Sequence, residues 1–328
     1  WLPIAEARPK IVEKLQSKGL MERIDENYIH RIATNYRGGG VIEPQIRKQW
    51  FIDVNKKFRH KHPSPRRGGS GRGLARTGEI VTLKLLMQRA VKSQLIEIIP
   101  DRFNKTYFHW IDNLRDWCIS RQLWYGHRIP VWYNGDEIFC GVEAPKGLGW
   151  EQDLDTLDTW FSAGIWPFSN LGWPDKTKDL QAYHPPSVLE TGYDILFFWV
   201  ARMILMTTYA LGDVPFKKVY LHGLVRDEQG RKMSKSLDNI IDPLDMIAKY
   251  GTDATRLSLM IGSTPGNDTK LSEAKVAGFR NFTNKLWNIS RFMLLNIKKP
   301  SRRAKRPTPK TLADKWILAR LDAVTREV

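Results

Sequence analysis

The sequence is poor in cysteine and has no long uninterrupted apolar segment. Its two cysteines, Cys118 and Cys140, are too few for a disulfide framework. The longest apolar run, 195–211, contains Arg202 and follows Asp194, so it is shorter and more polar than a membrane span. No charged segment followed by an apolar one opens the chain. We therefore expect a cytoplasmic protein without a membrane anchor.

Acidic residues are also scarce relative to basic ones. The chain has 52 Lys and Arg against 35 Asp and Glu, a net charge of +17 spread over 47–306. Such a charge attracts polyanions, and RNA is the natural candidate. A basic surface can equally serve solubility, so charge alone does not select tRNA. With 42% hydrophobic residues, 328 residues can form one large or two ordinary domains.

The most informative segment is 232–236, Lys232-Met233-Ser234-Lys235-Ser236, which follows an apolar stretch at 219–221. Two lysines three residues apart can follow a polyphosphate whose charge moves during a reaction. Lysine suits this task because its charge is compact. A solvated basic loop is the alternative for an isolated pentapeptide of this kind. The neighbouring segments therefore decide between the two interpretations.

These neighbouring segments carry a family resemblance. His222-Gly223 precedes the pentapeptide, Asn239-Ile240-Ile241-Asp242-Pro243 follows it, and 250–256 reads YGTDATR. Together they resemble the second nucleotide motif, KMSKS, and the YGxDAxR segment of the class I aminoacyl-tRNA synthetases. The resemblance extends over almost the whole chain, from about Ala7 to Leu321.

Three further segments point to the valyl enzymes within this class. They are DWCISRQLWYGHRIP at 116–130, LDTWFS at 157–162 and TGYDILFFWVARM at 191–203. Isoleucyl enzymes would resemble DxWFDSG at 158–164 and GxDQxRGW at 192–199, and this chain differs at both places. Valine is therefore the expected amino acid, with an isoleucyl-type synthetase as the alternative. No individual role is predicted for Arg121, Trp124 or His127.

Helix and strand patterns alternate along the central part of the chain. Strands are expected at 187–190 and 218–221, and helices at 155–165, 194–211 and 243–249. This alternation predicts an α/β fold with a parallel sheet. The resemblance implies the second half of a class I synthetase Rossmann-like parallel sheet. It also implies a remnant of the editing-domain return and the start of an α-helical anticodon-binding domain.

The domain boundaries follow from the same resemblance and from composition. The expected order is the end of the editing insertion and return to the catalytic core at 1–52, an Arg/Gly-rich insert or linker at 53–80, the catalytic domain at 81–270, a helical stem-contact region at 271–299, a linker at 300–310 and the first anticodon-binding helix at 311–328. Residues 59–79 are so rich in Arg, Gly, Pro and Ser that we expect them not to order themselves. An RNA-binding insert and a sequence error or shifted reading frame both remain open.

The segment 191–202 begins where a strand meets a helix, at the place where α/β sheets bind ligands. Thr191 and Asp194 have the spacing of a capping box. Ile195, Trp199 and Arg202 share one helical face. Without the resemblance, ordinary core packing would explain the apolar pair.

The resemblance assigns roles to specific residues. Ile195, Trp199 and Trp160 are expected to form the walls of a valine pocket. Gly192, Asp194, His222, Gly223, Met233, Ser234 and Ser236 are expected to bind ATP or the adenylate. Lys232 and Lys235 are the expected catalytic residues, which hold the ATP phosphates together with Mg²⁺. No nucleophilic Ser or Cys is assigned.

Two motifs of the family are absent. Residues 35–40 replace a Cys-x-x-Cys knuckle of relatives, so we expect no zinc site. His30, His60 and His62 lack ligand-spaced partners and are expected at the surface. The HIGH-like motif of the first nucleotide half is also missing, so the chain is expected to be an internal fragment that forms no valyl-adenylate alone.

Two functions from different classes follow. The first is a valine-tRNA ligase that uses ATP, L-valine and tRNA(Val) and acts as a monomer. The second is a non-catalytic RNA-binding protein that retained half of the fold. Both KMSKS lysines, Asp194 and Trp199 favour the first, because an RNA scaffold has no physical need of them.

Overall fold

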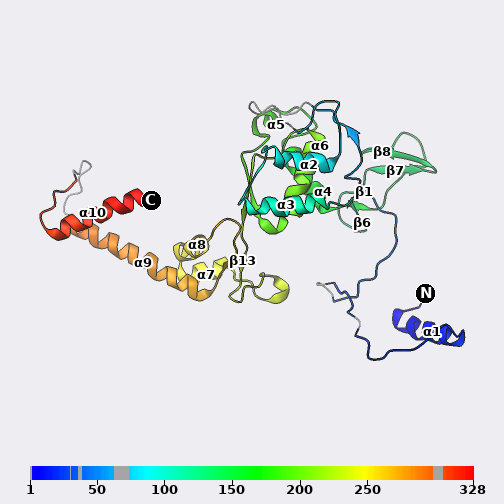
Figure 1. The fold of residues 1–328 in the computed structure, drawn as a ribbon, viewed down its shortest axis with the longest axis horizontal. Coiled ribbons are helices and arrows are strands. Elements are labelled where there is room, and N and C mark those ends of the chain that lie inside the picture. The colour runs from blue at the N-terminus through cyan, green and yellow to red at the C-terminus, as the bar shows by residue number, and fades with distance from the viewer. Residues whose placement is uncertain (1, 30, 36–38, 63–73, 298–305) are drawn as a thin grey trace.

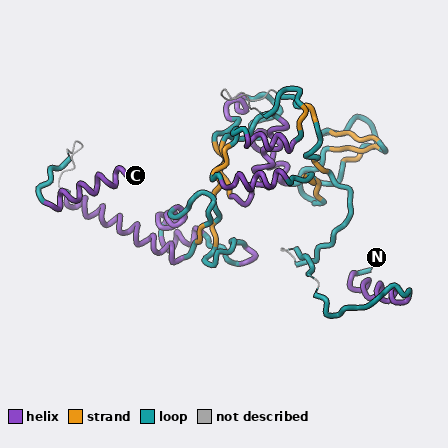
Figure 2. The backbone as a smooth tube through the Cα atoms, viewed as in Figure 1, coloured by secondary structure: helices purple, strands orange, loops and turns teal. Residues whose placement is uncertain are grey.

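The structure, a computed structural model, describes residues 2–29, 31–35, 39–62, 74–297 and 306–328 (Figure 1). The central body holds most strands, a helical arm carries the C-terminal part, and α1 lies apart at the N-terminal end. Between α1 and β1 the described chain is almost entirely loop (Figure 2). Among the described residues, no helix is both long and apolar enough to cross a membrane.

The helices alternate with short strands through the body and then predominate. The α-helices are α1 (Ile4–Ser17), α2 (Leu83–Lys92), α3 (Arg102–Asp112), α4 (Thr159–Ser169), α5 (Lys178–Tyr183), α6 (Arg202–Ala210), α7 (Pro243–Tyr250), α8 (Thr252–Met260), α9 (Glu273–Asn296) and α10 (Leu312–Glu327). The 3₁₀-helices are η1 (Tyr193–Ile195) and η3 (Lys235–Leu237), and η2 (Leu196–Ala201) is a π-helix.

The strands of the described residues are two to five residues long. They are β1 (Phe51–Ile52), β2 (Phe58–Arg59), β3 (Ile80–Val81), β4 (Glu97–Ile99), β5 (Trp117–Cys118), β6 (Ser120–Arg121), β7 (Val131–Asn134), β8 (Glu137–Cys140), β9 (Glu151–Gln152), β10 (Thr156–Leu157), β11 (Val188–Gly192), β12 (Lys218–His222), β13 (Val225–Arg226) and β14 (Thr269–Lys270).

The central sheet is parallel, as the alternating pattern predicts. Its order is β11-β12-β4, with Gly192 opposite His222 and Tyr220 opposite Ile99. The core beneath it includes the fully buried Val219 and Leu221 of β12, together with apolar side chains from α2, α3, η2 and α6. The mixed α/β class is therefore confirmed, and the sheet fixes the ends of β11 and β12 side by side.

The helix expected over 194–211 is interrupted. η1 precedes the π-turn η2, and a regular α-helix begins only at Arg202. The predicted capping box is wrong, because Gly192 caps η1 without a side-chain hydrogen bond. The Asp194 carboxylate instead accepts a hydrogen bond from Lys232 Nζ, at 3.0 Å. A π-turn widens the helix locally and is frequent at functional sites.

The expectation that 59–79 cannot order itself is wrong for both ends of that segment. Residues 63–73 lie outside the described part of the chain. Around them, β2 pairs with β3, and Leu74 and Ala75 are buried. Glu79 forms an ion pair with Arg89 of α2 at 2.8 Å. The segment is so polar overall that its composition did not indicate the buried positions of Leu74 and Ala75.

The three histidines expected at the surface differ from one another. His60 is only 1% exposed, so a surface position is wrong for it. His62 is partly buried, and the two imidazole rings lie 5.9 Å apart. His30 lies outside the described residues.

Leu74 provides a direct test of this packing. Replacing it by alanine should lower the free energy of unfolding by about 3 kcal/mol, because its side chain is fully buried in the main core. Leu148→Ala is the matched control, since that leucine is 98% exposed and should cost less than about 0.5 kcal/mol. Urea unfolding of both variants measures the difference. Equal stabilities would mean that 74–79 is not packed.

Candidate functional site

The candidate site lies at the carboxyl ends of β11 and β12, where parallel sheets bind ligands. Gly192 ends β11 opposite His222, which ends β12. A Cβ at Gly192 would come within 2.7 Å of Asp194 Oδ1. His222 Nε2 lies 3.4 Å from Glu190 Oε1. The structure thus brings together three residues that the sequence predicts for adenylate binding.

Gly223, the fourth of these residues, is a packing requirement. A Cβ at this position would overlap the carbonyl oxygen of Asn267 and approach the amide of Asp268. The same turn is held by Leu224 N, which donates to Asp268 Oδ1 at 2.8 Å. β13 and β14 then pair in parallel just beyond it. Only glycine allows these two backbone segments to touch.

Asp268 links this turn to η1. Its carboxylate forms an ion pair with Arg226 and accepts a hydrogen bond from Tyr193 Oη at 3.0 Å. Burial raises the pKa of Asp268, but the hydrogen bonds from Leu224 N and Arg226 outweigh burial and lower it. The start of η1 and the chain leaving β12 are therefore tied together next to the strand ends.

A tight hairpin leads into the segment 232–236. The backbones of Arg226 and Lys232 form an antiparallel β-bridge, and Gly230 makes the turn between them with φ +83°. Asp227 is almost fully buried and accepts from Arg231 N and Arg231 Nε, both at 2.7 Å. A hydrogen bond from Asn239 and those from Arg231 lower the pKa of Asp227 to about 2. Asp227 is thus an ionised anchor beneath the loop.

The two lysines have different surroundings. Lys232 Nζ lies 3.0 Å from Asp194 Oδ2, so the loop reaches back to the end of β11. Lys235 is exposed and begins η3. Met233 packs against the small core between α7, α8 and α9. Ser234 N donates to Asn239 Oδ1 at 2.9 Å, and Ser236 lies within η3.

The predicted amino-acid pocket residues gather where α4 meets η2. Trp160 stacks on Phe198, with ring centroids 6.0 Å apart. Trp199 Nε1 donates to the Ala163 carbonyl at 3.2 Å. Ile195 is partly buried and lies at the junction of η1 and η2. Both tryptophans therefore lie at the contact between α4 and η2, and Ile195 immediately precedes η2.

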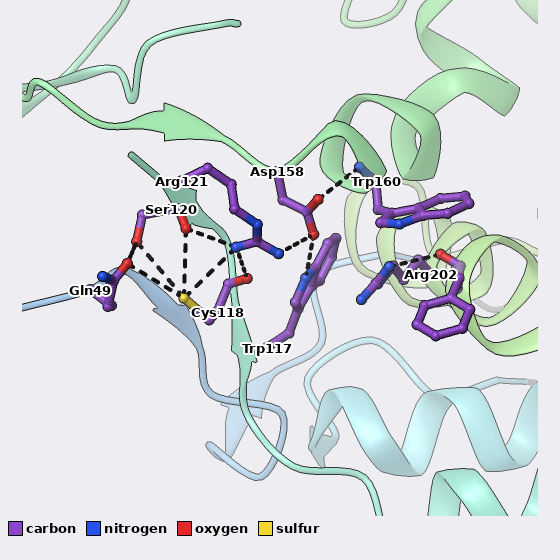
Figure 3. A network of polar contacts seen from close by, with 9 residues as sticks. Gln49, Trp117, Cys118, Ser120, Arg121, Asp158, Trp160 and Arg202 are labelled. Atoms are coloured by element: carbon purple, nitrogen blue, oxygen red, sulfur yellow. Dashed lines mark hydrogen bonds and ion pairs between the residues drawn. The ribbon is translucent and has the colours of Figure 1, made fainter. Parts of the chain in front are cut away.

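Asp158, the N-cap of α4, connects Trp160 to Trp117 and Arg121 (Figure 3). Its Oδ1 accepts from Trp160 N at 3.3 Å. Its Oδ2 accepts from Trp117 Nε1 at 3.0 Å and lies 2.9 Å from Arg121 Nη2. Arg121 thus has a structural role that the sequence did not predict. By contrast, Trp124 is 96% exposed.

Arg202 lies among aromatic rings next to this network (Figure 3). Its guanidinium is 4.5 Å from the Trp117 ring centroid and 5.7 Å from that of Trp160. Its Nη1 donates to the Phe198 carbonyl at 3.0 Å. Burial lowers the pKa of Arg202. Cation–π contacts of this kind hold the Trp160 ring against Arg202.

A cavity of about 450 Å³ lies next to this cluster. Trp110, Trp117, Phe197 and Arg202 contribute to its lining, whereas none of the three predicted pocket residues does. Among the described residues, no group of three or more His, Cys, Asp or Glu side chains is placed to hold a metal ion.

Sequence reasoning missed the residues that shape the loop. Asp227, Asn239 and Asp268 are each within hydrogen-bonding reach of the site segments. Asn239 was visible as the first residue of the segment 239–243 that carries part of the family resemblance, but its partners are set by the hairpin geometry. Asp268 comes from a segment with no recognisable motif.

Comparisons with known proteins agree on the family. The family model described as tRNA synthetases class I (I, L, M and V) matches residues 12–147 and 141–272. The valine-tRNA ligase of Clostridium acetobutylicum is 46% identical over 98% of this chain and 35% of its own length. That of Bacillus subtilis is also 46% identical, over 98% of this chain and 34% of its length. The chain thus spans about a third of these relatives.

Solved structures resemble the fold more distantly. Methionyl-tRNA synthetase of Mycobacterium tuberculosis, bound by methionyl-adenylate, superposes with a TM-score of 0.55 at 22% identity. The superposition covers 75% of this chain and 46% of that one. At this identity the likeness shows the fold alone.

Proposed function

Because this chain belongs to the class I tRNA synthetases of the I, L, M and V group, we propose that its protein is a valine-tRNA ligase. It joins valine to ATP and passes the valyl group to tRNA(Val). The observation that carries the proposal is the meeting of Lys232 with Asp194 at the ends of β11 and β12. The two curated valine-tRNA ligases at 46% identity support valine as the amino acid.

In the first step, an oxygen of the valine carboxylate attacks the α-phosphorus of ATP. The new O–P bond forms as the bond to pyrophosphate breaks, so charge moves onto the leaving group. Lys232 and Lys235 hold the phosphates of ATP, which brings its own Mg²⁺ as part of the substrate. Positioning and charge neutralisation suffice, so no side-chain nucleophile takes part.

Asp194 and Lys232 exchange partners in this proposal. Both groups of their ion pair are partly exposed, with 66% of the Lys232 side chain and 30% of the Asp194 side chain accessible. Such a pair contributes at most about 1 kcal/mol, so a polyphosphate can displace it readily. Lys232 then binds phosphate, while Asp194 accepts from the ribose hydroxyls. Gly192, His222 and Gly223 allow the nucleotide to approach the backbone.

Met233, Ser234 and Ser236 complete the nucleotide-binding loop, and Trp160, Ile195 and Trp199 form the valine pocket. The domain order expected from the sequence belongs to the same proposal, with α9 in the stem-contact region and α10 opening the anticodon-binding part. The net charge of +17 suits a tRNA partner. We place the protein in the cytoplasm as a monomer.

Trp199 tests the pocket assignment. Replacing it by alanine should raise the isoleucine-to-valine ratio of kcat/KM about tenfold, because space for one methylene is typically worth that factor. Trp173→Ala is the control, since Trp173 packs on Phe168 at the other end of α4 and should leave the ratio unchanged. ATP–pyrophosphate exchange with each amino acid measures the ratio. A constant ratio would make Trp199 an ordinary packing residue.

The function itself is tested with the full-length protein and four amino acids. Exchange of pyrophosphate into ATP should favour valine over isoleucine by about a hundredfold and over leucine and methionine by more. tRNA(Val) should then be charged with valine. A preference for isoleucine would favour the isoleucyl alternative. Absence of exchange with all four amino acids, together with RNA binding, would favour the non-catalytic alternative.

A further inference from the structure

Asn239 uses all the polar groups of its amide on three separate parts of the KMSKS loop and its hairpin. Its Oδ1 accepts from Ser234 N at 2.9 Å. Its Nδ2 donates to Asp227 Oδ2 at 2.9 Å and to the Lys232 carbonyl at 3.2 Å. The partly buried side chain therefore connects the beginning and the middle of the loop to the ionised anchor Asp227.

Only one orientation of this amide is compatible with its surroundings. A flipped amide would direct Oδ1 toward the Asp227 carboxylate and the Lys232 carbonyl, which are both acceptors. Its NH₂ group would then face the Ser234 N–H, which is also a donor. Asparagine thus provides one acceptor and two donors in a fixed arrangement. No other side chain of this length offers that set.

The backbone delivers Asn239 to this position. η3 ends at Leu237, and the next residue, Asp238, has a left-handed φ of +49° that reverses the chain. Asparagine and aspartate tolerate this region better than other non-glycine residues. The reversal returns the chain beneath Lys232 and Ser234. The side chain of Asn239, the last residue of the loop 232–239, therefore contacts the backbone at Lys232 and Ser234, near the start of the same loop.

We propose that Asn239 is the positioning residue that sets the geometry of the two catalytic lysines. The Asn239 side chain donates to the Lys232 carbonyl and so fixes the backbone of Lys232. It also accepts from the backbone amide of Ser234, and this fixes the backbone immediately before Lys235. This inference rests on the proposed function, because it assigns a role in valine activation. A displacement of about 1 Å in such groups can cost a hundredfold in rate, so a residue without substrate contact can have a large effect.

The first test measures the loop directly and needs no activity. Asn239→Ala removes the acceptor of the Ser234 amide, so hydrogen exchange at that amide should become at least about tenfold faster. The exchange rate at Leu221 N in the fully buried part of β12 should stay the same, which reports intact folding. An unchanged rate at Ser234 would overturn the proposal.

The second test measures valine-dependent ATP–pyrophosphate exchange by the full-length protein. Asn239→Asp removes both donors and places a second carboxylate against Asp227, so kcat should fall about a hundredfold. The KM for valine should change less than about twofold, because the pocket is separate. Asn55→Asp is the control with the same charge change, at an exposed residue in the turn after β1, and should match the parent.

The third test uses the pairing with Asp227. In the Asp227→Asn, Asn239→Asp double variant an amide again faces a carboxylate, so kcat should recover at least about threefold over Asn239→Asp alone. No recovery would overturn the coupling through Asp227. Faster Ser234 exchange with parental kcat would overturn the catalytic role. If the parent lacks valine-dependent exchange, the proposed function fails and this catalytic role fails with it, while the amide test still decides whether Asn239 shapes the loop.

Discussion

Replacing Lys235 by alanine in the full-length protein should lower kcat for valine-dependent ATP–pyrophosphate exchange about a hundredfold to a thousandfold. The lysine is exposed at the start of η3, on the loop whose other lysine reaches Asp194. Its charge acts on phosphates that become more negative as pyrophosphate leaves. Valine affinity should stay nearly constant, since Lys235 lies outside the proposed valine pocket of Trp160, Ile195 and Trp199. Equilibrium dialysis with labelled valine measures that affinity.

Two companion variants make the Lys235 result specific. Lys235→Arg keeps the charge but replaces a compact ammonium by a planar fork, so activity should be only partly retained. Lys176→Ala removes one positive charge from an exposed loop before α5 and should behave as the parent. If Lys235→Ala retained exchange within a few-fold of the parent, this loop would not be the phosphate clamp.

Gly223→Ala should destabilise the fold by about 3 kcal/mol and reduce exchange strongly. The new Cβ would overlap the Asn267 carbonyl, and backbone on both sides of the contact cannot rotate away as a side chain can. β13 and β14 must separate to make room, which displaces the hairpin that carries the KMSKS loop. Thermal unfolding and kcat measured on the same variant report both effects.

The matched control for this variant lies within α9. Gly278 has no atom near its missing Cβ and an ordinary helical position, so Gly278→Ala should stabilise the helix by about 0.5–1 kcal/mol. The same substitution thus has opposite signs at the two positions. A neutral Gly223→Ala would show that the backbone at Gly223 and the backbone at Asn267 are not in contact.

Local patterns predicted the elements that position the site. Asp242 and Pro243 predict the start of α7, and the Asp242 side chain accepts from Leu244 N as its N-cap. The parallel pairing of β11 and β12 followed from alternation of strand and helix. The cap depends on neighbours within a few residues, and the alternation of strand and helix can be followed along one continuous stretch, so a sequence displays both.

Features that depend on distant segments were not visible. The Asp194 carboxylate has the spacing of a cap, yet Lys232, thirty-eight residues later, binds it instead. Leu74 looks isolated within a polar segment but is buried in the main core. Asn239 belongs to a recognisable segment, but its hydrogen bond to Asp227 could not be predicted because the hairpin brings the two residues together. In each case tertiary contacts decide what a local pattern leaves open.

The most direct test of the account is a structure of the full-length protein with a nonhydrolysable valyl-adenylate analogue. We expect the adenosine at the ends of β11 and β12, with the ribose hydroxyls on Asp194 and the valine side chain against Trp160 and Trp199. Lys232 should have left Asp194. An analogue bound elsewhere, or bound with the Lys232–Asp194 pair intact, would contradict the assignment of this site.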